Sequence, residues 1–345
     1  MELSLERFLQ MLTQEPFLAT AVLLTLAVIF VNGWTDAPNA IATVVGTGAL
    51  GMERAVALAA VCNFLGVLVM TALSAAVAMT ISDLVNFGTN TGQALMALTA
   101  ALLAVVVWAV AAWGFAIPTS ESHALIAALT GAALALQGDF GAVDGAAWAR
   151  VLWGLVSSVL PGFFLGWLLC RLLRRICGGR GQRFFQRAQI LGGAAMAFMH
   201  GAQDGQKFLG VLLLTVALGG GNSTASPRLP VWLMFLCAAI MALGTAVGGR
   251  RIIRAVGMDM VRLSPEQGFA ADLAGALTLL ASTFLGLPAS TTHTKTTAIM
   301  GAGAARSSGA VDGHIVKGIL WVWALTFPGC GLLGWALVKL LIWLR

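Results

Sequence analysis

The segment Asn32-Gly-Trp-Thr-Asp-Ala-Pro-Asn39 interrupts an apolar block that extends over residues 17–50. A helix that crosses about 30 Å of hydrocarbon needs about 20 apolar residues, so this block is too long for one straight span. Hydrocarbon cannot satisfy free backbone N–H and C=O groups, so unwound backbone at membrane depth is tolerated only around a cavity or a ligand. The segment therefore predicts a broken membrane helix whose break borders a binding site.

The composition of the whole chain agrees with a membrane location. Of its 345 residues, 59% are hydrophobic and only 10% are charged. Soluble domains carry about 45–50% apolar and about 25% charged residues. We therefore predict an all-α integral membrane protein and exclude soluble enzymes, disordered scaffolds and nucleic-acid binders, despite the net charge of +6. The five cysteines form no C-x-x-C pair, so neither a disulfide framework nor a cysteine metal site is expected.

Polar interruptions recur along the chain in a regular order. Three more lie inside apolar blocks, at residues 118–123, 200–207 and 288–293. Asp36 and His123 are 87 residues apart, and Asp204 and His293 are 89 residues apart. Each time the order is a broken helix, a plain helix, an apolar arm that ends in Pro-x-Ser-x-(Ser/Thr)-His, and another helix. This pattern predicts an internal repeat.

The repeat and the loop charges together predict the organisation of the chain. Residues 17–173 form the first repeat, 174–187 a basic linker and 188–343 the second repeat. The stretch 171–187 has six arginines and no acid, so the positive-inside rule places it in the cytoplasm. Segments poor in Lys and Arg are expected to face outward: 81–93, 137–147 and 219–230. With this orientation the repeat is inverted, its two broken helices run in opposite directions, and both termini are extracytoplasmic.

Two apolar blocks, 94–136 and 268–305, must each begin and end on the same side of the membrane. Each is therefore either a pair of full spans or a re-entrant helical hairpin. The first would open outward and the second inward. Inverted repeats with interrupted helices are typical of secondary transporters whose site lies at the membrane midplane.

The tips of these two blocks have the composition of an anion site. A tip that begins a helix with Ser or Thr presents free N–H groups, hydroxyl donors and the positive end of a helix dipole, which suits phosphate or a similar oxyanion. The expected phosphate ligands are Ser120, Ser122, Ser290, Thr291, Thr292, Asn39 and Gln203. The same hydroxyls also fit ordinary helix N-caps, which use the same geometry.

Two aspartates, Asp36 and Asp204, lie at matching positions of the repeat. An aspartate at the centre of a membrane helix costs about 2.5–3.5 kcal/mol, so both need partners. Two carboxylates repel an oxyanion unless cations or protons neutralise them. We therefore expect Asp36 and Asp204, with Asn32 and Thr35, to bind the coupling ion. That ion is Na⁺, H⁺ or a divalent metal carried with phosphate.

Five other polar residues at motif positions are expected to support or gate the site: Glu121, His123, His200, His293 and Lys207. Glu121 is either a gate or proton site, or a surface acid on an open hairpin mouth. The histidines are expected to orient neighbours rather than to bind ligand directly. Lys207 could replace a bound cation. Lys207 and Lys295 could also contact the substrate, pair with an acid or extend toward the membrane surface.

These motifs carry a family resemblance. NGWTDAPNAIATVVGTGAL (32–50) and AFMHGAQDGQKFLGVL (197–212) resemble the signature of the PiT inorganic phosphate transporters, in which a Gly-x-Asn-Asp-x-x-Asn core occurs once in each half. PASTTHTKTTAIMGAGAAR (288–306) and WALTFPGCGLLGWAL (323–337) also look like the C-terminal half of that family. The resemblance implies cation-coupled uptake of inorganic phosphate, a transport domain formed by the broken helices and hairpins, and a homodimer.

This sequence departs from the family pattern in both halves. Thr35 and Gln203 stand where the pattern has asparagine before the aspartate. The second half has Gln206 and Lys207 where the first has Pro38 and Asn39. These differences bear on the coupling ion more than on the substrate.

We therefore predict a symporter of the inner (plasma) membrane that moves inorganic phosphate into the cell with Na⁺ or H⁺ by alternating access. Its expected partners are phosphate and the lipid bilayer, without nucleic acid and without an enzymatic cofactor. A sulfate or metal–phosphate symporter of the same fold is the alternative. The buried acids disfavour an anion channel. An intramembrane enzyme is disfavoured because no H-E-x-x-H or serine-elbow motif is present.

Overall fold

The computed structural model describes residues 3–115, 117, 119–177, 181–220, 229–260, 263–306, 311 and 313–344. Three predictions fall partly outside this set, and one of them is the outward-facing segment 219–230, of which residues 221–228 are not described. Pro118 of the first predicted hairpin tip lies outside the described residues, and so do residues 178–180 of the predicted basic linker. The described part of the chain is helical apart from connecting segments and one isolated pairing between Val85 and Val143, which confirms the all-α fold class.

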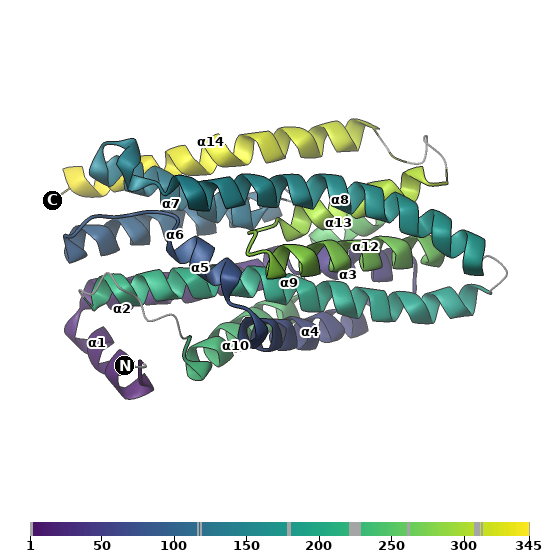
Figure 1. Ribbon diagram of the computed structural model, residues 1–345, viewed down its shortest axis with the longest axis horizontal. Coiled ribbons are helices and arrows are strands. Elements are labelled where there is room, and N and C mark those ends of the chain that lie inside the picture. The colour runs from purple at the N-terminus through teal and green to yellow at the C-terminus, as the bar shows by residue number, and fades with distance from the viewer. Residues whose placement is uncertain are drawn as a thin grey trace.

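Fourteen α-helices make up the described structure (Figure 1). The first eight are α1 (Leu5–Gln14), α2 (Pro16–Thr35), α3 (Pro38–Gly46), α4 (Met52–Leu73), α5 (Ala76–Ser82), α6 (Thr91–Gly114), α7 (Glu121–Gln137) and α8 (Gly145–Cys177). The other six are α9 (Gln182–Gly219), α10 (Val231–Val247), α11 (Arg250–Arg254), α12 (Pro265–Phe284), α13 (Thr291–Ala304) and α14 (Gly313–Trp343). By length and composition, five described helical stretches could cross a membrane, or six if the bent pair α10–α11 counts as one span.

The first predicted break is present between α2 and α3. α2 ends at Thr35, and Asp36 and Ala37 form a turn before α3 begins at Pro38. Proline has no N–H to donate to the carbonyl four residues earlier, so the helix cannot continue unchanged through Pro38. The amide groups of Asp36 and Ala37 both donate to the carbonyl of Asn32 instead, at 2.9 and 3.1 Å. The break therefore projects Asp36 from a distorted turn.

The second predicted break is absent, and that prediction is wrong. α9 runs without interruption from Gln182 to Gly219, through the segment 200–207. The residue two positions after the aspartate explains the difference. It is Pro38 in the first half and Gln206 in the second, and glutamine keeps the N–H that continues a helix.

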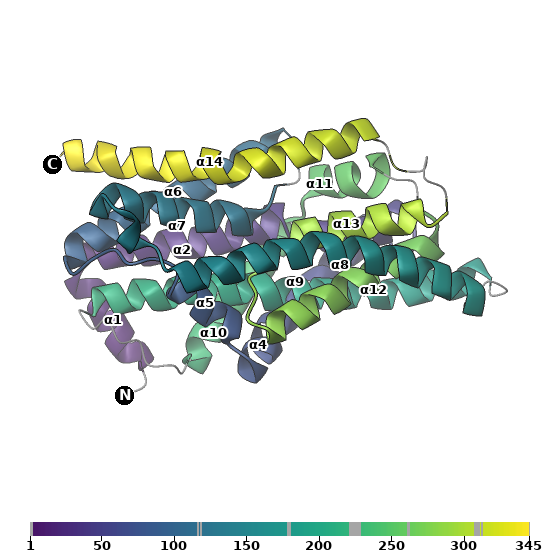
Figure 2. The same ribbon diagram turned by 45° about the horizontal axis from the view of Figure 1, so that its top comes forward.

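Two helical hairpins face each other across the middle of the molecule. α6 pairs with α7, and α12 pairs with α13. Figures 1 and 2 show α6 and α7 toward the end that holds both chain termini, and α12 and α13 toward the opposite end. The tips meet, because the hydroxyl oxygens of Ser120 and Ser290 are 2.9 Å apart. This arrangement agrees with the hairpin interpretation of blocks 94–136 and 268–305.

The segments that connect the helices lie at two opposite ends of the molecule, and they are sorted between these ends as the loop charges predict. Both chain termini lie at one end in Figures 1 and 2, whereas α8 ends and α9 begins at the other. The two Lys/Arg-free segments 81–93 and 137–147 lie side by side, because the N–H of Asn86 donates to the carbonyl of Ala142 at 2.8 Å. The arginine-rich ends of α8 and α9 are thus separated from the Lys/Arg-free connections by the length of the helices.

The two halves of the chain pack as an interlocked unit. The plain helix of each half packs on the main helix of the other, so α4 lies against α9 and α10 against α2. The last helix of each half packs on the hairpin of the other, so α8 lies against α12–α13 and α14 against α6–α7. Every site residue on one half is therefore held in place by elements from the other.

The outer surface is apolar, as a membrane protein requires. α8 carries one hydrophobic residue every four positions, each more than 40% exposed, at Leu152, Val156, Leu160, Phe164, Leu168, Leu172 and Ile176. Positions four apart share one helix face, so this stripe is available to lipid. The polar residues of the predicted motifs lie on the inside instead.

Gly66 allows α4 to pack closely against α9, where no larger side chain would fit. A Cβ built on Gly66 of α4 would lie 1.9 Å from the carbonyl oxygen of Phe198 on α9. Gly66→Ala should therefore lower the free energy of unfolding by about 1–3 kcal/mol, the usual cost of overpacking. The measurement is the thermal midpoint of the detergent-purified protein. Gly318→Ala on α14, where nothing lies within 4 Å of the added Cβ, is the control and should not lower the midpoint, because alanine also favours the helix. Equal midpoints for the two variants would contradict this packing.

Candidate substrate and ion site

Two helix N-termini meet at the hairpin tips. Ser120 caps α7 by accepting a hydrogen bond from the N–H of His123 at 3.3 Å. Ser290 caps α13 in the same way, accepting from the N–H of His293 at 3.2 Å. The positive ends of two helix dipoles and their first N–H groups, which have no intrahelical partner, are therefore brought together. This is the anion-attracting arrangement that the sequence predicts for the tips.

The two predicted aspartates lie next to these tips. The hydroxyl oxygen of Thr291, in the first turn of α13, lies 3.4 Å from Asp36 Oδ2 and 3.3 Å from Asp204 Oδ2. Thr292 donates a short hydrogen bond to Asp36, and Ser122 donates to Asp204 at 3.3 Å. The hydroxyls expected to bind phosphate thus contact the carboxylates expected to bind the coupling ion.

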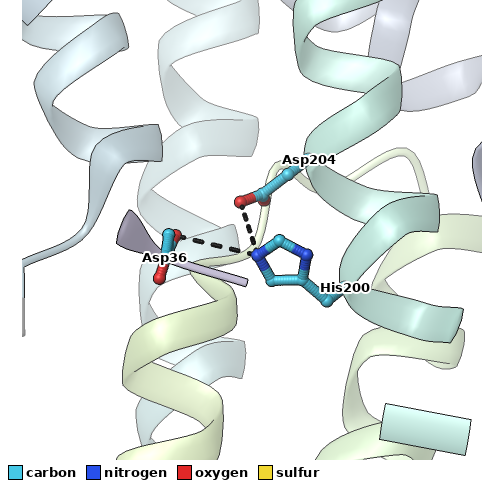
Figure 3. A group of neighbouring side chains, drawn as sticks. All are labelled: Asp36, His200 and Asp204. Carbon is cyan, nitrogen blue, oxygen red and sulfur yellow. Dashed lines mark ion pairs between the residues drawn. The ribbon is translucent and has the colours of Figure 1, made fainter. Parts of the chain in front are cut away.

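His200 faces both carboxylates (Figure 3). Its Nε2 lies 3.4 Å from Asp204 Oδ2 and 4.0 Å from Asp36 Oδ2. Its Nδ1 lies 2.9 Å from Asn63 Oδ1, and the amide nitrogen of Asn63 donates to Thr245 at 3.2 Å. That donation orients the Asn63 oxygen toward the imidazole, so Nδ1 carries the proton and Nε2 faces the acids. Ligand atoms of Asp36, His200 and Asp204 all lie within 4.8 Å of one another, a spacing suitable for a metal ion.

Asn63 and Thr245 were not predicted as site residues. Both are buried in helices that the sequence marks as plain spans, α4 and α10. The available signal was a single amide in an otherwise apolar block, because a buried Asn in a membrane helix needs a partner. Sequence spacing alone does not show that this partner is His200.

The ammonium group of Lys207 is fully enclosed in the same cluster. Its Nζ donates to Asp204 Oδ1 at 2.7 Å, to the hydroxyl of Ser122 at 2.7 Å and to the carbonyl of Ala289 at 2.5 Å. The side chain is 1% exposed. Lys207 therefore pairs with an acid, Asp204, as one of the interpretations of the sequence expected. The interpretation that Lys207 extends toward the membrane surface is wrong.

Other predicted residues surround the aspartates. The amide of Asn39 donates to Asp36 Oδ1 at 2.7 Å, and that of Asn32 donates to Asp204 Oδ2 at 3.1 Å. The amide oxygens of both asparagines are buried, and neither has a hydrogen-bond partner among the described residues. Both side chains therefore keep an oxygen available for a cation.

Glu121 belongs to this buried cluster, so the interpretation as a surface acid on an open hairpin mouth is wrong. Its side chain is 2% exposed, and one oxygen accepts a short hydrogen bond from Thr35. The other oxygen, Oε2, has no partner among the described residues. Glu121 thus adds a third carboxyl group beside Asp36 and Asp204.

Three predicted residues point elsewhere. Gln203 donates to Thr283 at 3.0 Å and to the carbonyl of Leu287 at 3.3 Å, so it holds the second hairpin. The rings of His123 and His293 lie 4.5 Å apart and pack against aromatic residues of α14, Phe327 and Trp323. In this arrangement the contacts of the two imidazoles are with aromatic rings.

A second buried ion pair joins the two helices of the second hairpin. Lys295 of α13 pairs with Asp272 of α12 through a short contact, and both side chains are fully buried. The ammonium also donates to Thr43 at 2.9 Å and to the carbonyl of Ala40 at 3.1 Å. The pair therefore ties the two arms of the second hairpin to α3.

Removing one member of that pair should destabilise the protein. Lys295→Met leaves Asp272 uncompensated, which costs about 3–5 kcal/mol for a buried pair. The thermal midpoint in detergent should fall markedly. The double variant Asp272→Asn/Lys295→Met leaves no unpaired charge and should recover much of the loss. A single variant as stable as the wild type would show that Asp272 is neutral or otherwise paired.

Buried carboxylates, opposed hairpin tips and a broken helix inside a lipid-facing shell define the architecture of a secondary transporter. Comparison with known proteins agrees. Residues 32–334 match the model of the phosphate transporter family, so the chain belongs to that family. This confirms the family indicated by the motifs. It also places the protein among transporters rather than enzymes.

Curated relatives match over nearly the whole chain. A Bacillus subtilis protein described as "Probable low-affinity inorganic phosphate transporter" is 36% identical over 318 residues, which cover 91% of this chain and 93% of that protein. A Rhizobium meliloti protein of the same description is 35% identical over 323 residues, with 92% and 94% coverage. A solved structure named "The sodium-dependent phosphate transporter" has the same fold, with a TM-score of 0.79, 22% identity, and 96% and 100% coverage.

Proposed function

We propose that this protein is a symporter that moves inorganic phosphate into the cell together with a cation by alternating access. The observation that carries the proposal is the meeting of two helix N-termini with a pair of buried aspartates. The N-termini attract an oxyanion, whereas the carboxylates repel it until they are neutralised. Family membership supports phosphate as the oxyanion.

Phosphate would bind between the two hairpin tips. The proposed ligands are the first N–H groups of α7 and α13 and the hydroxyls of the tips, Ser120, Ser122, Ser290, Thr291 and Thr292. Ser120 and Ser290 are also the N-caps, and a cap oxygen can accept from the helix while its O–H donates to an anion. These donors lie on two different hairpins, so phosphate would bridge them.

The hydroxyl contacts supply a coupling mechanism. A hydroxyl has one proton to donate, and the protons of Thr292 and Ser122 are directed at Asp36 and Asp204. When a cation or a proton neutralises a carboxylate, that hydroxyl no longer needs to solvate it and can turn to phosphate. Cation binding would thus create the phosphate site, and phosphate would in turn favour cation binding, because linkage is reciprocal.

The coupling ion would bind beside Asp36. The buried site holds three carboxyl groups, Asp36, Asp204 and Glu121, against one ammonium group, that of Lys207. The oxygens around Asp36 include the unpartnered Oδ1 of Asn39 and the hydroxyl of Thr292. Oxygen ligands of this kind suit Na⁺, and Asp36 or Glu121 could equally take a proton.

The proposal includes an arrangement in the membrane. The arginine-rich ends of α8 and α9 would lie in the cytoplasm and both termini outside. The two hairpins would then approach the site from opposite sides, so movement of either would open it to one side. The homodimer implied by the family resemblance is part of this proposal.

Reconstitution tests the proposal directly. Purified protein in liposomes should accumulate radiolabelled phosphate when a Na⁺ or a proton gradient is imposed, and Asp36→Asn should abolish that accumulation because it removes the coupling charge. Asp83→Asn, which changes an exposed aspartate, is the matched control and should transport normally. Absence of phosphate and sulfate uptake by the wild type under every gradient would overturn the transporter assignment. Normal uptake by Asp36→Asn would remove Asp36 from coupling.

A metal–phosphate symporter is the second candidate, favoured by the Asp36–His200–Asp204 cluster. Neither Na⁺ nor a proton requires an imidazole, whereas imidazole with carboxylates suits divalent ions such as Zn²⁺. The chemical species carried would then be a neutral metal–phosphate complex.

Chelation separates the two candidates. If the complex is the substrate, a chelator should stop phosphate uptake by the wild type, added Zn²⁺ should restore it, and His200→Gln should lose the response to metal. Zinc and phosphate should then enter together when both are labelled. Uptake that is indifferent to the chelator and to His200→Gln would leave the monovalent symporter as the function.

A further inference from the structure

The contacts of Lys207 are those of a bound cation. Its ammonium touches a carboxylate oxygen of Asp204, the hydroxyl oxygen of Ser122 and the backbone carbonyl oxygen of Ala289, all within 2.7 Å. Carboxylate, hydroxyl and carbonyl oxygens are the ligands that hard cations such as Na⁺ and Ca²⁺ use. The three oxygens come from α9, α7 and the tip before α13, so the ammonium joins both hairpins to the central helix.

The other half of the chain contains the repeat-related set of oxygens. An offset of 168 positions relates Asp204 to Asp36. An offset of 170 positions relates Ala289 to Thr119 and, in the opposite direction, Ser122 to Thr292, because the two hairpins are exchanged. These three residues are also in contact with one another. The Thr292 hydroxyl bonds to Asp36 Oδ1 and lies 3.2 Å from the carbonyl oxygen of Thr119.

The residue at the position of Lys207 in that half is Asn39, 168 positions earlier. Both residues donate to the Oδ1 of the aspartate three positions before them, at 2.7 Å in each case. Asparagine leaves its own Oδ1 buried and without a partner among the described residues. The half with Asn39 therefore offers an additional oxygen and no fixed positive charge, whereas the half with Lys207 supplies the charge itself.

We propose that the ammonium group of Lys207 is a built-in cation that fills one of two repeat-related cation positions. The inference rests on the proposed symport function. Only the position formed by Asp36, Thr292 and Thr119 then exchanges its cation during transport. Lys207 neutralises Asp204 permanently, and it sets the number of cations carried with each phosphate one lower than in a chain with asparagine at both positions.

The substitution Lys207→Asn tests the proposal, because it gives both halves the same Asp-x-x-Asn pattern. The variant should bind one Na⁺ more than the wild type, measured with radioactive sodium on detergent-purified protein. In liposomes it should carry one more Na⁺ per phosphate. Its half-saturating phosphate concentration should fall as Na⁺ rises, by about 5–150-fold, the usual range for coupling between two sites.

Two controls make the outcome specific. Asp204→Asn/Lys207→Asn lacks the carboxylate of the new position and should bind no additional Na⁺. Lys339→Asn, which removes an exposed lysine on α14, should behave as the wild type. If Lys207→Asn is not monodisperse, Lys207→Gln also supplies an amide oxygen and retains more of the side-chain volume, and it takes its place.

Several results would overturn the proposal. One is a Lys207→Asn protein whose Na⁺ binding equals that of the wild type. Another is a half-saturating phosphate concentration raised equally at every Na⁺ concentration, which would show that the ammonium binds phosphate itself. Failure of the wild type to carry phosphate would reject the proposed function, but the comparison of Na⁺ binding would still decide the role of Lys207.

Discussion

The burial of three carboxyl groups beside two helix N-termini is the constraint on which the rest of the structure depends. Asp36, Asp204 and Glu121 are almost completely enclosed, and one ammonium, that of Lys207, lies among them. Charge in a membrane interior is expensive unless it is paired and hydrogen-bonded. The hydroxyls of the tips and the amides of Asn32 and Asn39 meet this requirement in the arrangement observed. Any ligand must therefore displace or reinforce these contacts.

The interlocked packing explains how such a site is held in place. No single half of the chain completes it, since Asp36 comes from the first half and its hydroxyl partner Thr292 from the second. Helices that belong to different halves of the chain approach each other closely at glycines, as α4 and α9 do at Gly66. A displacement of the second hairpin would consequently change the ligands of both aspartates at once, because Thr291 contacts both.

The two halves of the chain carry matching sequence motifs, and the residues at which these motifs differ have different chemistry. Pro38 breaks one central helix while Gln206 lets its counterpart continue. Asn39 and Lys207 occupy matching positions, but only the lysine brings a charge. Similarly, Glu121 lies opposite Thr291 in the repeat and adds an acid on one side only. Matching motifs thus carry different charges in the two halves of the chain, and these differences would decide the choice of coupling ion.

The sequence alone was sufficient for the membrane class, the all-α fold class and the family. Apolar block lengths, loop arginines and polar interruptions are local properties of the sequence. Each one predicts a membrane span, the side on which a loop lies or a break in a helix without knowledge of the tertiary structure. The tertiary structure decided which polar groups meet. It buried Glu121, paired Lys207 with Asp204 and Lys295 with Asp272, and brought Asn63 to His200. It also turned Gln203 toward the second hairpin. Spacing along the chain cannot determine these contacts, because each joins elements whose separation depends on how the whole set of helices packs.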